Sequence, residues 1–149
     1  TNIGHFRAAA KFLEGRYDIP TRLWIAPPTK MDALILTAEG YYSILGKSGA
    51  RMEMPGCSLC MGNQAQIRKG STAISTSTRN FPNRLGIDTR VYLGSAELAA
   101  MCALAGRIVT VAEYMEQIKL VNAKAADVYR YMNFDKIPEF VEVAETVEM

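Results

Sequence analysis

The sequence predicts an α/β fold, built as a mostly parallel sheet of short strands with helices on both faces in a three-layer arrangement. Short strand-like segments alternate along the chain with segments of helical periodicity, which is the pattern of a parallel sheet. Hydrophobic residues make up 49% of the chain and charged residues 21%, a composition typical of globular domains. With 149 residues, no internal repeat and no linker-like stretch, the chain has the size of one ordinary domain.

The first half of the chain opens with a predicted amphipathic helix over residues 3–15. Its apolar residues recur at helical spacing, and Gly15 is expected to end it. The elements expected next are a strand over 21–26, a short helix opened by the capping box of Thr29 and Asp32, a helix over 37–45 and a strand over 51–54.

The second half repeats the alternation. The elements expected there are a helix over 62–68, a strand over 72–78, a strand over 91–93, an almost wholly apolar and therefore buried helix over 96–106, and a long helix from Thr110 to about Met132. Ser95 is expected to cap the apolar helix, and Thr110 forms a capping box with Glu113. Residues 135–149 are acidic with scattered apolar positions, which predicts an arm or a tail.

Composition narrows the classes of function. A net charge of +2 with scattered Lys and Arg does not indicate a surface for nucleic acid. Three cysteines, no amino-terminal signal segment and no apolar run of about eighteen residues predict a cytoplasmic protein with reduced thiols and no membrane span. The single histidine, His5, is interpreted as a helix-end residue and not as a catalytic one. Because the sequence begins almost inside its first helix, we expect it to be a segment of a longer protein.

Cys57 and Cys60 form a C-x-x-C pair after a Pro-Gly turn, and four interpretations fit such a pair. Structural zinc is disfavoured, because no second cysteine or histidine pair is present to complete four ligands. A dithiol redox pair, a pair of small buried hydrophobes and an iron–sulfur ligand pair all stay open. An iron–sulfur cluster needs at least one further thiolate. Cys102 lies in the apolar helix as a filler, so that thiolate would come from outside these 149 residues.

Arg79 and Arg84 lie in a loop rich in Asn, Pro and Gly. Two guanidiniums held by such turns can bind carboxylates or phosphates through paired hydrogen bonds, although surface arginines without a role are common. The hydroxyls of residues 75–78 add donors for an anion or simply form an edge strand. Both motifs follow the ends of predicted parallel strands, where α/β sheets gather their ligands. We therefore expect the cysteine pair and the arginine loop at the same edge of the sheet.

Three stretches carry a family resemblance, together with the opening residues 1–7: MPGCSLCMGNQ over 54–64, STSTRNFPNRLG over 75–86 and YLGSAELA over 92–99. They resemble the aconitase family of iron–sulfur hydro-lyases, and in particular its bacterial B-type branch. The resemblance runs from Thr1 to about Phe134, and little of it extends into residues 135–149.

The resemblance implies an enzyme that interconverts citrate and isocitrate through cis-aconitate on a 4Fe-4S cluster in the tricarboxylic acid cycle; the B-type branch is also linked to 2-methylisocitrate dehydration. Cys57 and Cys60 would be two of three cluster thiolates, with the third immediately before Thr1 and one iron left open as a Lewis acid. Arg79 and Arg84 would bind substrate carboxylates. Thr78 stands where the wider family often has Asn.

The family's catalytic serine base and its acid residues lie on domains outside this sequence. The resemblance therefore implies that residues 1–134 are a carboxyl-terminal cluster-bearing domain, inactive alone and partnered by the remaining domains of its parent enzyme. Two other classes of function compete with this one. One is RNA binding by a cluster-free form through Arg68, Lys69, Arg79 and Arg84, and the other is a dithiol redox domain that uses Cys57 and Cys60.

Overall fold

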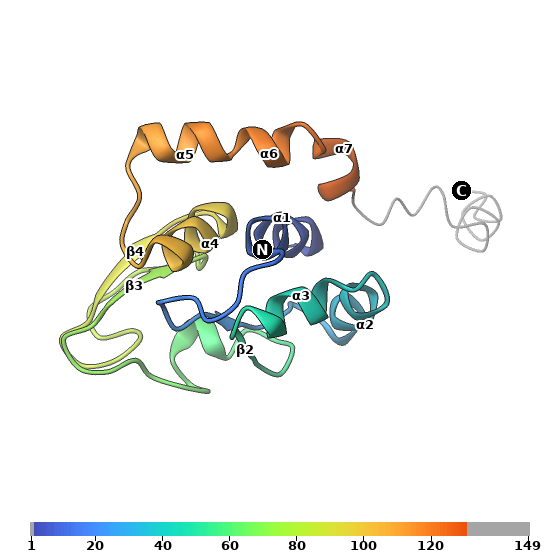
Figure 1. Cartoon of the computed structure of the whole chain (residues 1–149). Helices are drawn as coiled ribbons and strands as arrows, with labels where there is room; N and C mark the ends of the chain where they lie inside the picture. The colour runs from blue at the N-terminus through green and yellow to red at the C-terminus, as the bar shows by residue number, and fades with distance from the viewer. Residues whose placement is uncertain (1, 131–149) are drawn as a thin grey trace, which may run out of the picture.

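The computed structural model describes residues 2–130 (Figure 1). The elements in chain order are α1 (Ile3–Leu13), β1 (Trp24–Ile25), α2 (Lys30–Ala38), α3 (Tyr41–Lys47), β2 (Arg51–Met52), a 3-10 helix (Leu59–Met61), β3 (Thr72–Ser75), β4 (Arg90–Leu93), α4 (Ala96–Ala105), α5 (Val111–Gln117), α6 (Lys119–Asn122) and α7 (Ala125–Val128). The mixed α/β class with short parallel strands is confirmed.

The strands of the described residues form two separate parallel pairs in place of the single sheet that we predicted. β1 pairs with β2 over only two residues, and β3 pairs with β4 over four, from Thr72 opposite Arg90 to Ser75 opposite Leu93. The expected strands over 21–26, 51–54 and 72–78 are shorter than the sequence pattern indicated.

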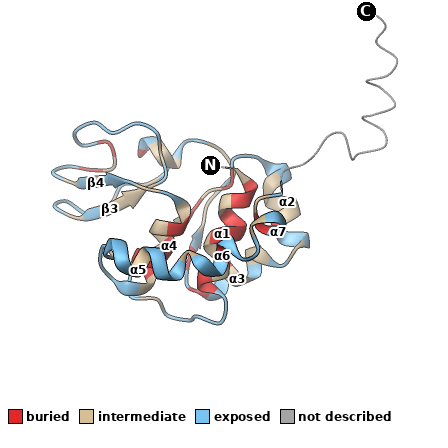
Figure 2. Cartoon of the chain, turned by 90° about the horizontal axis from the view of Figure 1, so that it is seen from above, coloured by how far each residue is buried: buried red, intermediate tan, exposed pale blue. Residues whose placement is uncertain are grey.

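Helix α1 is the centre of the core. It packs against α2 and α3 on one side and against α4, α6 and α7 on the other (Figure 1). Ala8, Ala10 and Leu13 on α1 are fully buried, and Leu36 and Leu45 from α2 and α3 join them. Small alanines on α1 allow its neighbours to approach closely. Figure 2 shows burial concentrated on α1 and α4, whereas β3, β4 and their loops extend from this helical body and are mostly exposed or half-buried.

A buried arginine ties the helices together. Arg7 on α1 donates from Nε and Nη2 to the two carboxylate oxygens of Glu39, at 2.7 and 2.8 Å. Its Nη1 donates to the backbone carbonyl of Arg130 at 2.7 Å. Arg7 is 4% exposed, so this pairing removes the cost of an isolated buried charge. The chain after α7 is thereby fastened to α1 and to the end of α2.

The helix caps that the sequence predicts are present. The capping boxes of Thr29 with Asp32 and of Thr110 with Glu113 both form, and Ser95 accepts from the backbone N–H of Leu98. The apolar helix forms as α4, and Cys102 is buried in it as expected. α1 ends two residues before Gly15, which adopts a left-handed backbone.

Three predicted helices differ from the structure. The helix over 37–45 begins instead at Tyr41, because left-handed Gly40 separates α2 from α3. The long helix from Thr110 is divided into α5, α6 and α7. The break between α6 and α7 occurs where the backbone of Lys124 leaves helical geometry. The helix over 62–68 is absent. Gly62 is left-handed and ends the 3-10 helix, and the amide of Ile67 bonds across to Leu85.

The predicted arm or tail over 135–149 lies outside the described residues. Within residues 2–130, no helix combines the length and the apolar character that crossing a membrane requires.

Candidate functional site

The cysteine pair lies on a tight turn that a Pro-Gly step introduces after β2. Gly56 has a φ of 141° and its amide donates to the carbonyl of Pro27 at 2.8 Å, which anchors the turn to the chain after β1. The two thiol sulfurs lie 2.9 Å apart, and the Cys60 thiol donates to the Cys57 carbonyl at 2.7 Å. Cys57 is exposed and Cys60 half-buried. Both sulfurs are thus presented together on the surface of one short turn.

Burial raises the pKa of the Cys60 thiol, and the hydrogen bond with the Cys57 thiol raises it further, while the nearby charge of Arg84 lowers it. Cys60 therefore holds its proton at neutral pH. A metal that bound here would displace this proton, since thiolates and not thiols are the ligands.

Arg84 lies directly behind the cysteine turn. Its side chain is 2% exposed, and its Nη1 donates to the carbonyl of Cys60. Its Nε and Nη2 are buried and have no hydrogen-bond partner among residues 2–130. These two nitrogens lie on one edge of the guanidinium, the edge that binds carboxylates in a bidentate way. A buried cation without a counterion is costly, so this edge is the strongest indication of an anion site among the described residues.

Arg79, the other arginine of the loop, has a different setting. It is exposed, and only its backbone amide is engaged within the described residues, by the hydroxyl of Ser77 at 3.3 Å. Ser75 likewise accepts from the amide of Ser77 at 3.3 Å, so these two hydroxyls shape the turn locally. The sequence treated the two arginines as an equivalent pair, and the structure separates them by burial.

The expectation that the cysteine pair and the arginine loop lie together holds for Arg84, although the argument from one sheet edge was wrong. The cysteine turn follows β2 and the arginine loop follows β3, which belong to different strand pairs. The two loops meet directly instead. The amide of Ile67 donates to the carbonyl of Leu85 at 2.8 Å, and the amide of Gly70 to that of Ile87 at 3.3 Å.

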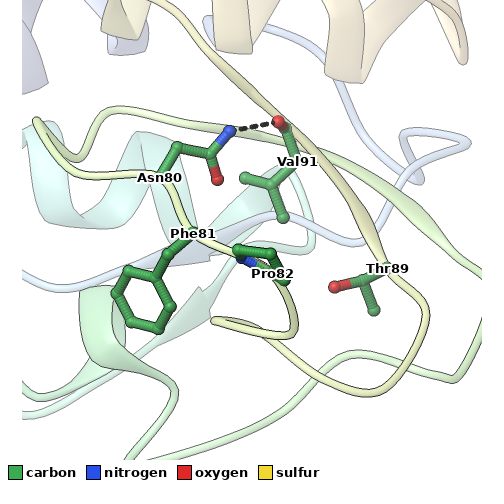
Figure 3. Close-up of a pocket in the computed structure, with 5 residues that line it drawn as sticks. All are labelled: Asn80, Phe81, Pro82, Thr89 and Val91. Atoms are coloured by element: carbon green, nitrogen blue, oxygen red, sulfur yellow. Dashed lines mark hydrogen bonds between the residues drawn. The ribbon is translucent and has the colours of Figure 1, made fainter.

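Asn80 is one of the turn-forming residues that the sequence predicts to hold the arginine loop, and the structure gives its hydrogen-bond partner. Its Nδ2 donates to the carbonyl of Val91 on β4 at 2.7 Å and so fixes the start of the arginine loop (Figure 3). Asn80 and Val91 also line an open hollow of about 300 Å³ together with Phe81, Pro82 and Thr89. Neither cysteine nor arginine lines this hollow, so it is separate from the candidate site. The preference of Asn for turns indicated its role in the loop, but not its bond to Val91 on β4.

The side chains near the site supply part of what an iron–sulfur cluster needs as ligands. Two thiols on one turn fit cluster ligation chemically, yet within residues 2–130 no group of three or more His, Cys, Asp or Glu side chains is placed to hold a metal ion. Cys102 is buried in α4, where its sulfur accepts from the amide of Val109 at 3.4 Å. His5 is engaged in the cap of α1 through its Nδ1. The chain therefore fits as a two-thiolate contributor that needs a ligand from elsewhere.

The RNA-binding alternative gains no support from the geometry. Of the four cations that it invokes, Arg84 is buried against the cysteine turn and Lys69 is 3.3 Å from the carboxylate of Asp88. Only Arg68 and Arg79 are exposed without a described side-chain partner. Two exposed charges do not form a phosphate-binding surface.

A family model and the similar known proteins all indicate the same family. A sequence model of the Aconitase family (aconitate hydratase) matches residues 1–106, which end at the carboxyl-terminal cap of α4. The chain is 64% identical over 150 residues to aconitate hydratase B of Pseudomonas aeruginosa, covering 100% of this chain. It is 60% identical to aconitate hydratase B of Salmonella typhimurium and 59% identical to that of Escherichia coli, each over 148 residues and 99% of this chain. The chain spans 17% of the length of each of these relatives.

Proposed function

The chain belongs to the aconitase family, and from that premise we propose that it is the carboxyl-terminal cluster-bearing part of a B-type aconitate hydratase. The parent enzyme would be a cytoplasmic hydro-lyase of the tricarboxylic acid cycle that interconverts citrate and isocitrate through cis-aconitate, with 2-methylisocitrate as a related substrate. Residues 1–134 would form the domain and residues 135–149 a terminal arm. The remaining domains would supply the catalytic base, and this chain alone would be inactive.

In this proposal Cys57 and Cys60 ligate a 4Fe-4S cluster together with a third cysteine upstream of Thr1. The 2.9 Å separation of their sulfurs on one surface turn supports a shared ligand role. When bound, such a cluster supplies a Lewis acid for the substrate hydroxyl and a carboxylate. The contribution of the chain itself is to give up two thiol protons, hold both sulfurs on one turn and keep Arg84 beside them.

The single observation that carries the proposal is the buried edge of Arg84. Nε and Nη2 lie out of solvent without a protein partner among the described residues, next to the cysteine turn. A substrate carboxylate would accept two parallel hydrogen bonds from this edge and would neutralise the buried charge. Arg79, which is exposed, would reach a second carboxylate of the same tricarboxylate from the mouth of the site.

The test is anaerobic reconstitution with iron and sulfide, read by visible absorption and by citrate dehydration. In the full-length parent protein, Cys57→Ser and Cys60→Ser should each lose the cluster absorption and the activity. The matched control is Cys102→Ala, which removes a buried thiol of α4 and should keep both. A stable cluster in the Cys57→Ser/Cys60→Ser double variant would contradict the proposal.

A second arm compares this 149-residue chain with a version extended upstream to the next cysteine. The proposal expects a stable cluster only in the extended version and turnover in neither. The same samples decide the dithiol alternative, which the 2.9 Å approach of the two sulfurs favours. That alternative expects a reversible Cys57–Cys60 disulfide of defined potential and no iron in either version.

A further inference from the structure

Gly62 lies two residues beyond Cys60, and its backbone rests against the backbone of Arg84. A Cβ placed on Gly62 would lie 2.4 Å from the Arg84 carbonyl oxygen, 3.5 Å from its carbonyl carbon and 3.7 Å from the Cα of Leu85. The nearest of these is a backbone atom, which cannot rotate away as a side-chain tip would. Gly62 is also buried and left-handed, with a φ of 72°. Hydrogen is therefore the only substituent that this contact accepts.

Arg84 is thus held to the cysteine turn at two points. Its guanidinium reaches the carbonyl of Cys60 through Nη1, and its own carbonyl lies against Gly62. The contact continues along both segments. Gly86 approaches the carbonyl oxygen of Ile67 so closely that a Cβ would lie 2.6 Å away, and Ile67 donates its amide to Leu85. The spacing between the two loops is set by backbone atoms and not by side chains that could adjust.

We propose that Gly62 is a positioning residue, which sets the distance between the Cys60 turn and the anion-binding edge of Arg84. This inference rests on the proposed function and extends it to a residue that touches neither cluster nor substrate. A side chain at position 62 pushes the Arg84 backbone outward and displaces its guanidinium, while Cys57 and Cys60 stay on their own turn. The distance between the two thiols and the Arg84 guanidinium then changes, although all three side chains are still present. A displacement of about 1 Å in a positioned group can lower activity roughly 100-fold.

The chain offers a matched control for the experiment. Gly70 has a φ of 75°, nearly that of Gly62, but a Cβ there would meet nothing within 4 Å. Ala at either position pays the same left-handed backbone penalty of about 1–2 kcal/mol. The difference between Gly62→Ala and Gly70→Ala therefore isolates the close approach to Arg84.

Both variants are made in the full-length protein and reconstituted with iron and sulfide. Gly62→Ala should raise KM for citrate roughly 10- to 100-fold, with the visible absorption of the cluster retained, whereas Gly70→Ala should change KM less than about twofold. In an Arg84→Gln background, Gly62→Ala should have no further effect on KM, because it acts through Arg84. Equal KM values for the two glycine variants, loss of the cluster in Gly62→Ala, or additive effects with Arg84→Gln would each overturn the inference.

A ligand-free measurement keeps this inference separate from the proposed function. Amide hydrogen exchange over residues 63–69 should be faster in Gly62→Ala than in Gly70→Ala, since the bond from Ile67 to Leu85 is lost when the loops part. If the wild-type protein binds neither cluster nor citrate, the proposed function fails, and equal exchange in the two variants separately refutes the spacing role.

Should Gly62→Ala not fold, Gly86→Ala takes its place, because a Cβ there forces the same two loops apart at their next contact, the carbonyl oxygen of Ile67. A raised KM with the cluster retained in Gly86→Ala would support the inference, and an unchanged KM would overturn it.

Discussion

Arg7 and Arg84 are both buried, 4% and 2% exposed, and both donate Nη1 to a backbone carbonyl. They differ at the other edge of the guanidinium. Arg7 places its Nε and Nη2 on the two oxygens of Glu39, whereas the same two atoms of Arg84 have no partner within residues 2–130. One arginine completes the helical body around α1, and the other lies in the loop that follows β3, against the cysteine turn that follows β2.

This difference distinguishes an arginine with a structural role, Arg7, from one that is available to bind an anion, Arg84. The body satisfies its buried charge internally, so Arg7 contributes to folding. The loop region leaves one edge of its buried guanidinium without a partner among the described residues, and this edge costs stability. Such a cost is expected where a site is prepared for a ligand. The comparison predicts that disturbing the two arginines will have opposite effects on stability.

The largest expected effect on stability comes from removing the carboxylate that pairs with Arg7, which leaves Arg7 with an unpartnered edge like that of Arg84. Glu39→Ala removes the carboxylate and leaves a buried guanidinium edge without a partner, which should lower the free energy of unfolding by about 3 kcal/mol. Urea denaturation of the 149-residue chain measures it. Glu116→Ala provides the control, because Glu116 pairs with Lys119 and the two side chains are 74% and 69% exposed. A loss as small as that of the control would show that the Arg7 pairing is not structural.

The same pairing predicts how stability depends on pH. The hydrogen bond from Arg7, helped by the charges of Arg7 and Arg130, holds the pKa of Glu39 below its ordinary value of 4.5. The stabilisation is therefore complete above pH 4.5 and is lost as the pH falls through the lower, folded-state pKa. The difference in stability between the wild-type chain and Glu39→Ala should shrink across that acidic range.

An intermediate effect, of opposite sign, is expected at Arg84. Arg84→Met removes two buried nitrogens that lack partners, Nε and Nη2, and one that donates to the Cys60 carbonyl, Nη1. Because each unsatisfied nitrogen costs about 1–3 kcal/mol and the lost bond contributes about 1 kcal/mol, the isolated chain should become more stable by at least about 1 kcal/mol. Arg7→Met, the matched variant, should be destabilising. A loss of stability in Arg84→Met that matches Arg7→Met would mean that Arg84 is a structural residue as well.

The sequence was sufficient for the helix caps, which depend on near neighbours along the chain. Thr29 with Asp32, Ser95, and Thr110 with Glu113 cap helices as predicted, because an N-cap bond spans only three residues. The prediction over 62–68 failed because glycine and a long-range bond from Ile67 to Leu85 overruled a weak helical pattern. The single sheet failed for the same reason, since strand pairing is decided by distant segments.

Residue type and spacing were enough to select Cys57, Cys60, Arg79 and Arg84 as candidates, and their roles stay predictions. The spacing of these residues in the sequence could not show which of their side chains are buried. Nothing in the local sequence distinguishes exposed Arg79 from buried Arg84, or marks Gly62 as the point where two loops touch. These properties arise from the packing of two segments that lie about twenty residues apart in the chain, and that packing is invisible to periodicity.

The smallest effect on stability is expected at Asn80, where a substitution tests the loop region separately from the helical body. Asn80→Ala removes the hydrogen bond from Nδ2 to the carbonyl of Val91, an exposed bond that contributes about 0.5–1.5 kcal/mol. Because Asn80 lies in the loop region and outside the helical body, this loss should appear as faster amide exchange over residues 79–86, with global unfolding nearly unchanged. Asn122→Ala on α6, where the side chain makes no described hydrogen bond, should change neither. If Asn80→Ala instead shifted global unfolding as much as Glu39→Ala does, the loop region would unfold together with the body, and Arg84 would have to be treated as part of the same cooperative unit as Arg7.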